Sequence, residues 1–288
     1  MALRDLLLAL FVMIVWAANF IFAKVVLYEV QPLLATGIRF LITALMILFL
    51  VKPPKKYMGQ LFLLSLTLGI GHFGVLFIGM RFIDAGTTSL ALMIEVPIAS
   101  VLAAIFFREH LSLRLIIGTI LAIFGVFLIA GEPNILANPS SFALILVAAF
   151  AWGVANLQMK KLAKVGSFTL NGWLCFFSMF HMFILSYFLE TNQIEVLKNI
   201  SWTAIGGIFY MVVGSTMIGY GIWYRLLGKY NVNQVVPIML LLPVFTLMLS
   251  VIFLGEDVTM LKVLGGSIIL SGVGLVIIKK QKVDPAAA

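Results

Sequence analysis

The segment Trp16-Ala-Ala-Asn-Phe-Ile-Phe-Ala-Lys24 has a counterpart, Trp152-Gly-Val-Ala-Asn-Leu-Gln-Met-Lys160, in the second half of this 288-residue chain. In both segments a tryptophan precedes a lysine by eight residues. Further markers follow in the same order in each half, namely a proline with a later glutamate and then two glycines seven residues apart: Pro97, Glu109, Gly118 and Gly125, then Pro243, Glu256, Gly265 and Gly272. Matches in one order at similar spacing predict an internal duplication.

The composition is that of a membrane protein. Apolar residues make up 63% of the chain and charged residues 10%, whereas about a quarter of the residues in a soluble domain are charged. Apolar stretches close to the roughly 20 residues that a membrane-spanning helix needs occur ten times. We therefore predict an all-α membrane protein with ten transmembrane helices, at Leu6–Leu27, Leu33–Val51, Tyr57–Met80, Thr87–Phe107, Leu113–Ala130, Phe142–Met159, Phe168–Leu189, Trp202–Trp223, Val232–Leu254 and Leu261–Ile278.

Five predicted spans lie in each half, and five is an odd number. The second half must therefore enter the membrane from the opposite face, which makes the halves two inverted-topology repeats. We expect an N-terminal five-helix repeat over residues 1–131 and a C-terminal one over 141–280. The tail 283–288 is expected to be a cloning remnant outside the fold. Inverted repeats of this kind suit alternating access, in which a central site opens to each side in turn.

The net charge of +8 is explained by topology and does not indicate nucleic-acid binding. With the N-terminus in the cytoplasm, 14 of the 19 basic residues fall at the cytoplasmic ends of the spans and four at the outer ends, with Arg39 inside a helix. Positive charge marks the cytoplasmic side of membrane proteins. We predict that both termini are cytoplasmic and that the lipid bilayer surrounds the chain.

Ionisable groups within the spans are the strongest functional signal, because each is costly in hydrocarbon unless it is paired or hydrated. Glu95 lies near the middle of the fourth span, next to the helix-loosening Pro97. In the functional interpretation, Glu95 binds a substrate ammonium or carries a proton. In the structural interpretation, it forms an ion pair with Arg39 that ties two helices together. His72, bracketed by glycines, either binds substrate and relays protons or makes one structural hydrogen bond. His181 is expected to be structural.

We further expect Trp16 and Asn19 in the first helix, and Trp152 and Asn156 in the sixth, to line a cavity, with interhelical hydrogen bonding as the alternative. The predicted substrate site thus comprises Trp16, Asn19, Arg39, His72, Glu95, Trp152 and Asn156. It would take a small zwitterion whose ammonium meets Glu95 and whose carboxylate meets Arg39 or His72. Glu95 and His72 are the candidates for proton coupling.

Other features are interpreted as structural. The glycines of the fifth and tenth spans permit close helix contact, so these helices are expected to be a scaffold or the interface of a homodimer. Cys175 is expected to be a buried apolar residue. The sequence lacks a nucleotide-binding loop, a dinucleotide fingerprint and a metalloprotease motif. We therefore expect no catalytic residues, no metal and no cofactor.

The ordered set Trp16-Ala-Ala-Asn-Phe with Lys24, Arg39-Phe, Pro97 followed by Phe-Phe-Arg-Glu109, and Pro243 followed by Phe-Leu-Gly-Glu256 resembles the drug/metabolite transporter superfamily, EamA type. The resemblance covers Leu6 to Ile278 and implies ten helices in two inverted halves. It also implies export of small metabolites, commonly amino acids, from the bacterial cytoplasm across the inner membrane. The second half lacks counterparts of Arg39 and Glu95, so the substrate is expected to be held asymmetrically.

The predicted function is that of a secondary transporter, an exporter of amino acids or related small metabolites by alternating access. The alternative is a flippase or exchanger of a larger amphiphilic or nucleotide-linked metabolite. An intramembrane enzyme would need a nucleophile or a carboxylate pair at one depth, which the lone Glu95 does not supply. A passive channel is less favoured, because inverted repeats with helix breaks are typical of gated carriers.

Overall fold

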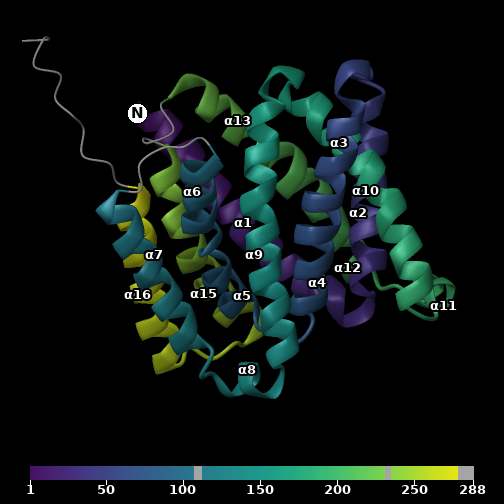
Figure 1. Ribbon diagram of the computed structural model, residues 1–288. Helices are drawn as coiled ribbons and strands as arrows, with labels where there is room; N and C mark the ends of the chain where they lie inside the picture. Colours follow the sequence, from purple (N-terminus) through teal and green to yellow (C-terminus); the bar gives the residue numbers. More distant parts are fainter. Residues whose placement is uncertain (107–111, 231–234, 278–288) are drawn as a thin grey trace, which may run out of the picture.

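The computed structural model describes residues 1–106, 112–230 and 235–277, and this part of the chain is a bundle of helices without strands (Figure 1). Several predicted features lie outside the described residues: Glu109, the first residues of the ninth predicted span and the tail 283–288.

In the first half, each predicted span corresponds to one helix or to a stack of helical segments. The third span consists of three segments and the fourth of two. The elements are α1 (Leu3–Glu29), α2 (Pro32–Leu48), η1 (Lys55–Tyr57), α3 (Met58–Leu64), η2 (Ser65–Gly74), α4 (Val75–Met80), α5 (Ala85–Leu92), α6 (Glu95–Phe106) and α7 (Leu113–Ile129).

The second half repeats this order. Its eighth span has three segments and its ninth begins with a short 3₁₀ helix. The elements are α8 (Pro133–Ala137), α9 (Pro139–Lys161), η3 (Ala163–Val165), α10 (Ser167–Leu189), α11 (Gln193–Lys198), α12 (Trp202–Tyr210), η4 (Met211–Gly219), α13 (Tyr220–Lys229), η5 (Val236–Leu240), α15 (Leu241–Leu254) and α16 (Met260–Ile277). The short helices α8 and α11, which connect spans, were not among the predicted elements.

The helices confirm the predicted membrane architecture. Seven are long and apolar enough to cross a membrane, and three shorter apolar helices, Pro32–Leu48, Leu113–Ile129 and Ile238–Leu254, occupy the remaining predicted spans. Large apolar side chains lie exposed on the outside of the bundle, as hydrocarbon surroundings require; Phe127 is 75% exposed and Phe253 is 69% exposed. The protein is therefore an integral membrane protein.

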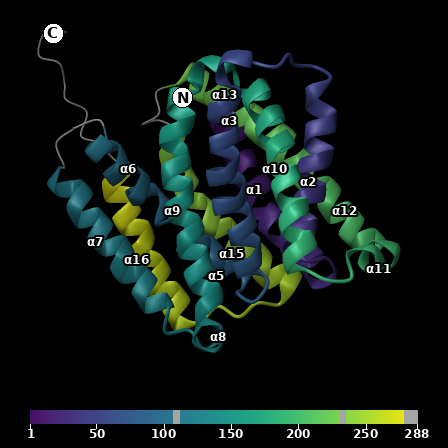
Figure 2. The ribbon, with the colours of Figure 1, turned by 45° about the vertical axis from the view of Figure 1, so that its right-hand side comes forward.

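The two halves are related by inversion. Figure 1 shows α1 beginning at the face that carries the N-terminus and α9 beginning beside α8 at the opposite face. The equivalent helices α1 and α9 each pack against the third and fourth spans of the opposite half. Helix α1 packs against α12, η4 and α15, and α9 packs against η2, α4 and α6. The pairs α2–α10 and α7–α16 flank the bundle on its two sides (Figure 2).

The fourth predicted span, Thr87–Phe107, is interrupted in the middle, close to the helix-loosening Pro97. A turn at residues 93 and 94 separates α5 from α6, and the backbone N–H groups of Met93 and Ile94 bond to carbonyls only three residues earlier. Pro97 lies in the first turn of α6, where the missing N–H of proline costs no helical hydrogen bond. Pro243 has the same position at the start of α15, so the two prolines mark equivalent helix starts.

The glycines of α7 and α16 face each other within one chain. A Cβ atom built on Gly272 would lie 2.5 Å from the carbonyl oxygen of Gly118, and one built on Gly125 would lie 2.7 Å from that of Gly265. Only glycine permits such an approach of two helix backbones. The glycines therefore act as a scaffold inside the chain, and homodimer formation through these helices stays a prediction.

The glycine contact can be tested with Gly272→Ala. We expect the midpoint of thermal unfolding in detergent to fall, because overpacking a close contact costs about 1–3 kcal/mol. The matched control is Gly206→Ala, in the interior of α12, where a Cβ would meet nothing within 4 Å. Alanine is a better helix former there by about 1 kcal/mol, so the control midpoint should stay or rise. Equal shifts in both variants would contradict a specific α7–α16 contact.

Candidate functional site

Two π-helical segments occupy the middles of the third and eighth spans, at equivalent places in the two halves. The N–H of Val75, which follows η2, donates to Ile70 O, and the N–H of Tyr220, which follows η4, donates to Ser215 O. These bonds span five residues instead of the four of an α-helix. Short π-helical segments are rare and frequently occur at functional sites.

The η4 segment is the place where the first, second and eighth spans meet. Trp16 in α1 donates its indole N–H to Ser215 O at 3.3 Å. Arg39 in α2 donates from Nη2 to Thr216 Oγ1 at 3.1 Å. The Thr216 hydroxyl in turn donates to Met211 O at 2.9 Å, across the π-helical turn. Two residues predicted for the substrate site are thus brought to one short segment.

Aromatic rings surround this junction. The ring of Trp16 lies with its centroid 5.0 Å from that of Tyr220 and 5.3 Å from that of Trp223. Gly219 allows the indole to approach, because a Cβ at this position would lie 2.6 Å from Trp16 Nε1. These three rings give the junction an amphipathic wall.

Arg39 is buried halfway along α2, with 3% of its surface exposed. Its Cζ lies 5.2 Å from the ring centroid of Phe73, and the ring of His72 lies 4.8 Å from that of Phe73. Phe73 thus connects Arg39 with one more predicted residue, His72. Apart from the bond to Thr216, Arg39 is short of partners: its Nε and Nη1 atoms have no hydrogen-bond acceptor among the described residues.

The η2 segment forms the corresponding junction with the second half. His72 Nδ1 lies 3.0 Å from Ala148 O in α9. A carbonyl oxygen only accepts, so Nδ1 carries the proton in this contact. Gln158 in α9 donates to Thr67 Oγ1 at 3.1 Å. The junction therefore binds the third span to the sixth, as η4 binds the eighth to the first.

Glu95 is the first residue of α6, halfway along the Ala85–Phe106 segment, with 7% of its surface exposed. In the described part of the chain, no hydrogen bond or ion pair engages its carboxyl group. The structural alternative, an ion pair of Glu95 with Arg39, is not formed in this structure. The carboxyl group is thus a buried group without a described partner.

The remaining predicted residues lie less centrally in this network. Asn19 Oδ1 in α1 is buried without a described hydrogen-bond donor. The amide of Asn156 donates to Trp152 O within its own helix, at 2.9 Å. Trp152 packs with Phe73 against a separate apolar cluster in α3, η2, α9 and α10. The structure thus connects Trp16, Arg39 and His72, whereas Trp152 packs against the same apolar cluster as Phe73 and the Asn156 amide bonds within its own helix.

Five residues of these junctions were not predicted from the sequence: Phe73, Ser215, Thr216, Tyr220 and Trp223. One signal was available: Gly214 and Gly219 bracket Ser215 and Thr216, as Gly69 and Gly74 bracket His72 and Phe73. His181, expected to be structural, has Nδ1 3.4 Å from Ser65 Oγ.

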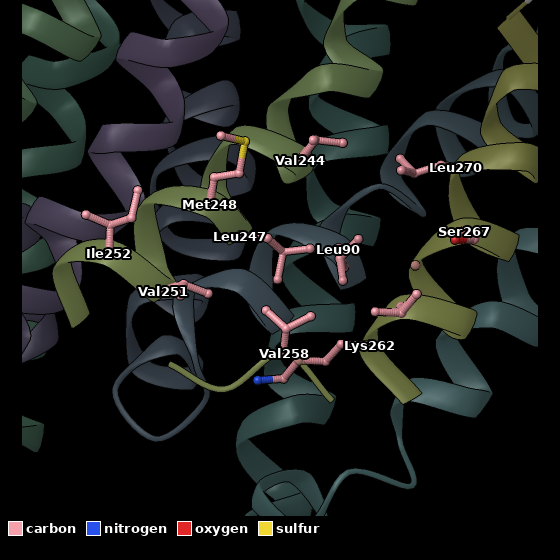
Figure 3. Close-up of a pocket in the computed structure, with 12 residues that line it drawn as sticks. Leu90, Val244, Leu247, Met248, Val251, Ile252, Val258, Lys262, Ser267 and Leu270 are labelled. Atoms are coloured by element: carbon pink, nitrogen blue, oxygen red, sulfur yellow. The ribbon is translucent and has the colours of Figure 1, made fainter. Parts of the chain in front are cut away.

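An apolar groove of about 530 Å³ lies on the flank of the bundle, between α5, α15 and α16 (Figure 3). Leu90, Met248 and Leu270 are among the residues that line it, and no predicted site residue does. Its one cation, Lys262, points its Nζ away from the apolar wall and binds Asp84 at 2.9 Å and Asp257 O at 2.8 Å.

Side chains close the helix ends at the face opposite the N-terminus. Lys24 donates to the carbonyls of Met80, Arg81 and Ile83 at the end of the third span. The carboxylate of Glu256 accepts from the N–H groups of Ala85 and Gly86 at 2.6 and 3.0 Å, which satisfies the helix start and its positive dipole end. Two of the repeat markers therefore cap helices from elsewhere in the bundle.

At the N-terminal face, Lys229 and Tyr230 both donate to Asp5 Oδ2 at 2.6 Å. The hydrogen bond to Asp5 raises the pKa of Lys229. This contact joins the start of α1 to the end of α13. The first and eighth spans are thus held together at this face as well as at η4.

Comparison with known proteins agrees with this architecture. The model of the EamA-like transporter family matches residues 3–131 and 140–278. The chain is 34% identical to a "Probable amino-acid metabolite efflux pump" of Salmonella typhimurium and 33% identical to one of Escherichia coli, each over 94% of both chains.

More distant proteins share the fold. The "Uncharacterized transporter YoaV" of Bacillus subtilis is 25% identical over 91% of this chain and 92% of its own length. A crystal structure superimposes with a TM-score of 0.63 at 14% identity, over 94% of this chain and 96% of that chain. With both inverted halves matched by one family model, and with relatives alike over nearly their full length, this chain belongs to the EamA-like transporter family.

Proposed function

We propose that this protein exports amino acids or related small zwitterionic metabolites across the bacterial inner membrane by alternating access. The observation that carries the proposal is that a basic side chain, Arg39, and an acidic side chain, Glu95, are both buried halfway along their spans without pairing with each other. Because an unpaired charge is costly inside a membrane, the carboxylate of a zwitterion would offset the cost of the buried Arg39 charge, and its ammonium would stabilise the ionised form of Glu95. The names of the efflux-pump relatives support this substrate class.

Alternation is supported by the two halves, which we infer to be residues 1–131 and 141–280. Each half places a π-helical segment in its third span and a break or 3₁₀ start in its fourth. Segments with weakened or shifted hydrogen bonds are natural places for a helix to bend. The inverted arrangement means that a bend in one half serves one face of the membrane and its counterpart serves the other.

The amphiphile alternative has one supporting feature, the flank groove of Figure 3. An anionic headgroup in this groove would need a free cation. Lys262 is 3% exposed and already holds Asp84. The groove therefore offers apolar surface without a free charge, and the zwitterion proposal is preferred. The substrate-site residues of the proposal are Trp16, Asn19, Arg39, His72, Glu95, Trp152 and Asn156.

Export activity is tested directly with the protein reconstituted in liposomes. We expect preloaded, labelled neutral amino acids to leave these liposomes faster than they leave protein-free liposomes loaded in the same way. The flux should saturate with amino-acid concentration. The panel includes choline and a lysophospholipid as non-zwitterionic and amphiphilic comparisons. Flux of the lysophospholipid alone would overturn the amino-acid proposal in favour of the amphiphile alternative.

The orientation is tested with a reporter that is active only outside the cytoplasm. The distribution of basic residues predicts that the N-terminal face is cytoplasmic, so a fusion at Ala288 should be silent. Insertion after Leu136, an exposed residue of α8 at the opposite face, should give strong activity. The reverse pattern would show that the protein is inserted the other way.

The role of Glu95 is tested with Glu95→Gln, which preserves shape while removing the titratable proton. We expect transport to fall at least tenfold, or to lose its dependence on pH, because the substrate ammonium or a coupled proton loses its carboxylate. Glu195→Gln, on the exposed surface of α11, is the matched control and should transport normally. A stably inserted Glu95→Gln protein with normal rate and pH dependence would contradict the proposal.

A further inference from the structure

The guanidinium of Arg39 is incompletely satisfied. It is buried, with 3% exposure, and it donates from Nη2 to Thr216 Oγ1. Its Nε and Nη1 atoms, which carry most of its N–H groups, have no acceptor among the described residues. Unlike a lysine, an arginine does not escape this situation by losing its proton, since it remains charged in proteins.

No carboxylate of the described chain neutralises this charge. The described ion pairs join Lys229 to Asp5 and Lys262 to Asp84, both near the ends of spans. The aromatic face of Phe73 gives a weak cation–π contact, with Cζ 5.2 Å from the ring centroid. A buried charge without a counter-ion is strongly destabilising. The site therefore favours an anionic group that comes from outside the protein.

His72 is the other candidate for this role, and its geometry argues against it. Its Nδ1 donates to Ala148 O at 3.0 Å. In a neutral ring the remaining nitrogen is then an acceptor, which repels a carboxylate. Arg39, in contrast, offers donors only, and the guanidinium matches the planar carboxylate in shape and charge.

We propose that Arg39 is the carboxylate receptor of the substrate site and that Thr216 is the residue that positions it. This inference rests on the proposed function, because it identifies which residue binds the acid group of the exported zwitterion. Thr216 Oγ1 accepts from Arg39 Nη2 and donates to Met211 O. The hydroxyl thereby holds the guanidinium against the π-helical turn of the eighth span, with Nε and Nη1 left for the ligand.

The arrangement links recognition to the helix that is proposed to bend. A carboxylate bound to Arg39 is connected to η4 through the hydrogen bond between Arg39 and Thr216. Trp16 is also attached to η4, through its hydrogen bond to Ser215 O. Binding therefore acts on the point where three spans meet. A substrate without a carboxylate lacks this connection and should be bound and transported poorly.

The test uses a neutral amino acid and three analogues that each change one group: its amide, its decarboxylated amine and its deaminated acid. The amino acid with the highest flux in the liposome assay is used, or leucine if none is transported. Binding is measured as the ligand-induced rise in thermal unfolding midpoint of the purified protein, and KM is measured in liposomes. The variants are Arg39→Gln, Arg39→Lys, Thr216→Val and Thr216→Ser, with the exposed Arg81→Gln as control.

In the wild-type protein we expect the amino acid and the deaminated acid to bind at least tenfold more tightly than the amide and the amine. Arg39→Gln should raise KM at least tenfold and abolish this preference, and Arg39→Lys should retain part of it. Thr216→Val should raise KM several-fold while Thr216→Ser, which keeps the hydroxyl, should not. Arg81→Gln should match the wild type.

The outcomes separate the two proposals. In one outcome the wild type transports no amino acid, yet the deaminated acid raises the unfolding midpoint of the wild type and not that of Arg39→Gln. The transport proposal then fails, and the proposal that Arg39 binds the carboxylate is supported. If amino acids are transported and Arg39→Gln keeps normal KM and normal discrimination against the amide, the receptor proposal is overturned and the transport proposal stands. If Arg39→Gln does not fold, two other results test the receptor proposal. It is overturned if the wild type binds the acid and the amide equally, or if Thr216→Val and Thr216→Ser have the same KM.

Discussion

The constraint on which this structure depends is that hydrocarbon offers no hydrogen-bonding partners to the backbone. Every N–H and C=O group within the membrane must therefore be satisfied inside the protein. Long helices meet this demand by themselves, and each departure from a regular helix needs a local solution. The turn at Met93 and Ile94 uses shorter-range bonds, the π-helical segments use longer ones, and the ends of helices are closed by side chains such as Lys24 and Glu256.

These departures are placed symmetrically. The third and eighth spans carry η2 and η4, while the fourth and ninth carry the break before α6 and the 3₁₀ start before α15. The flanking pairs α2–α10 and α7–α16 are regular and tightly packed, the latter through backbone contact at glycines. The bundle therefore combines regular flanks with an interrupted interior, which is the arrangement expected of a carrier in which the centre moves against a scaffold.

The chemistry of the two halves differs even though their architecture matches. At the η2 junction a histidine is hydrogen-bonded to a backbone carbonyl of α9, and at the η4 junction an arginine is held by one threonine hydroxyl. In the proposed alternating-access cycle, the symmetry of the backbone allows both halves to bend in equivalent ways. In the proposed substrate site, the asymmetry of the side chains matches an amino acid, which has different groups at its two ends.

The sequence by itself determined the membrane class, the ten spans, the duplication and the inversion. These follow from hydropathy and from the order of markers along the chain, which are local properties. It also placed Arg39, His72 and Glu95 inside spans. Only the tertiary structure decided which groups pair: Arg39 and Thr216 lie 177 residues apart in the chain, and Glu256 caps a helix that begins 171 residues earlier. Such contacts depend on how helices pack, which no local pattern encodes, because each helix satisfies its own backbone and leaves its neighbours unspecified.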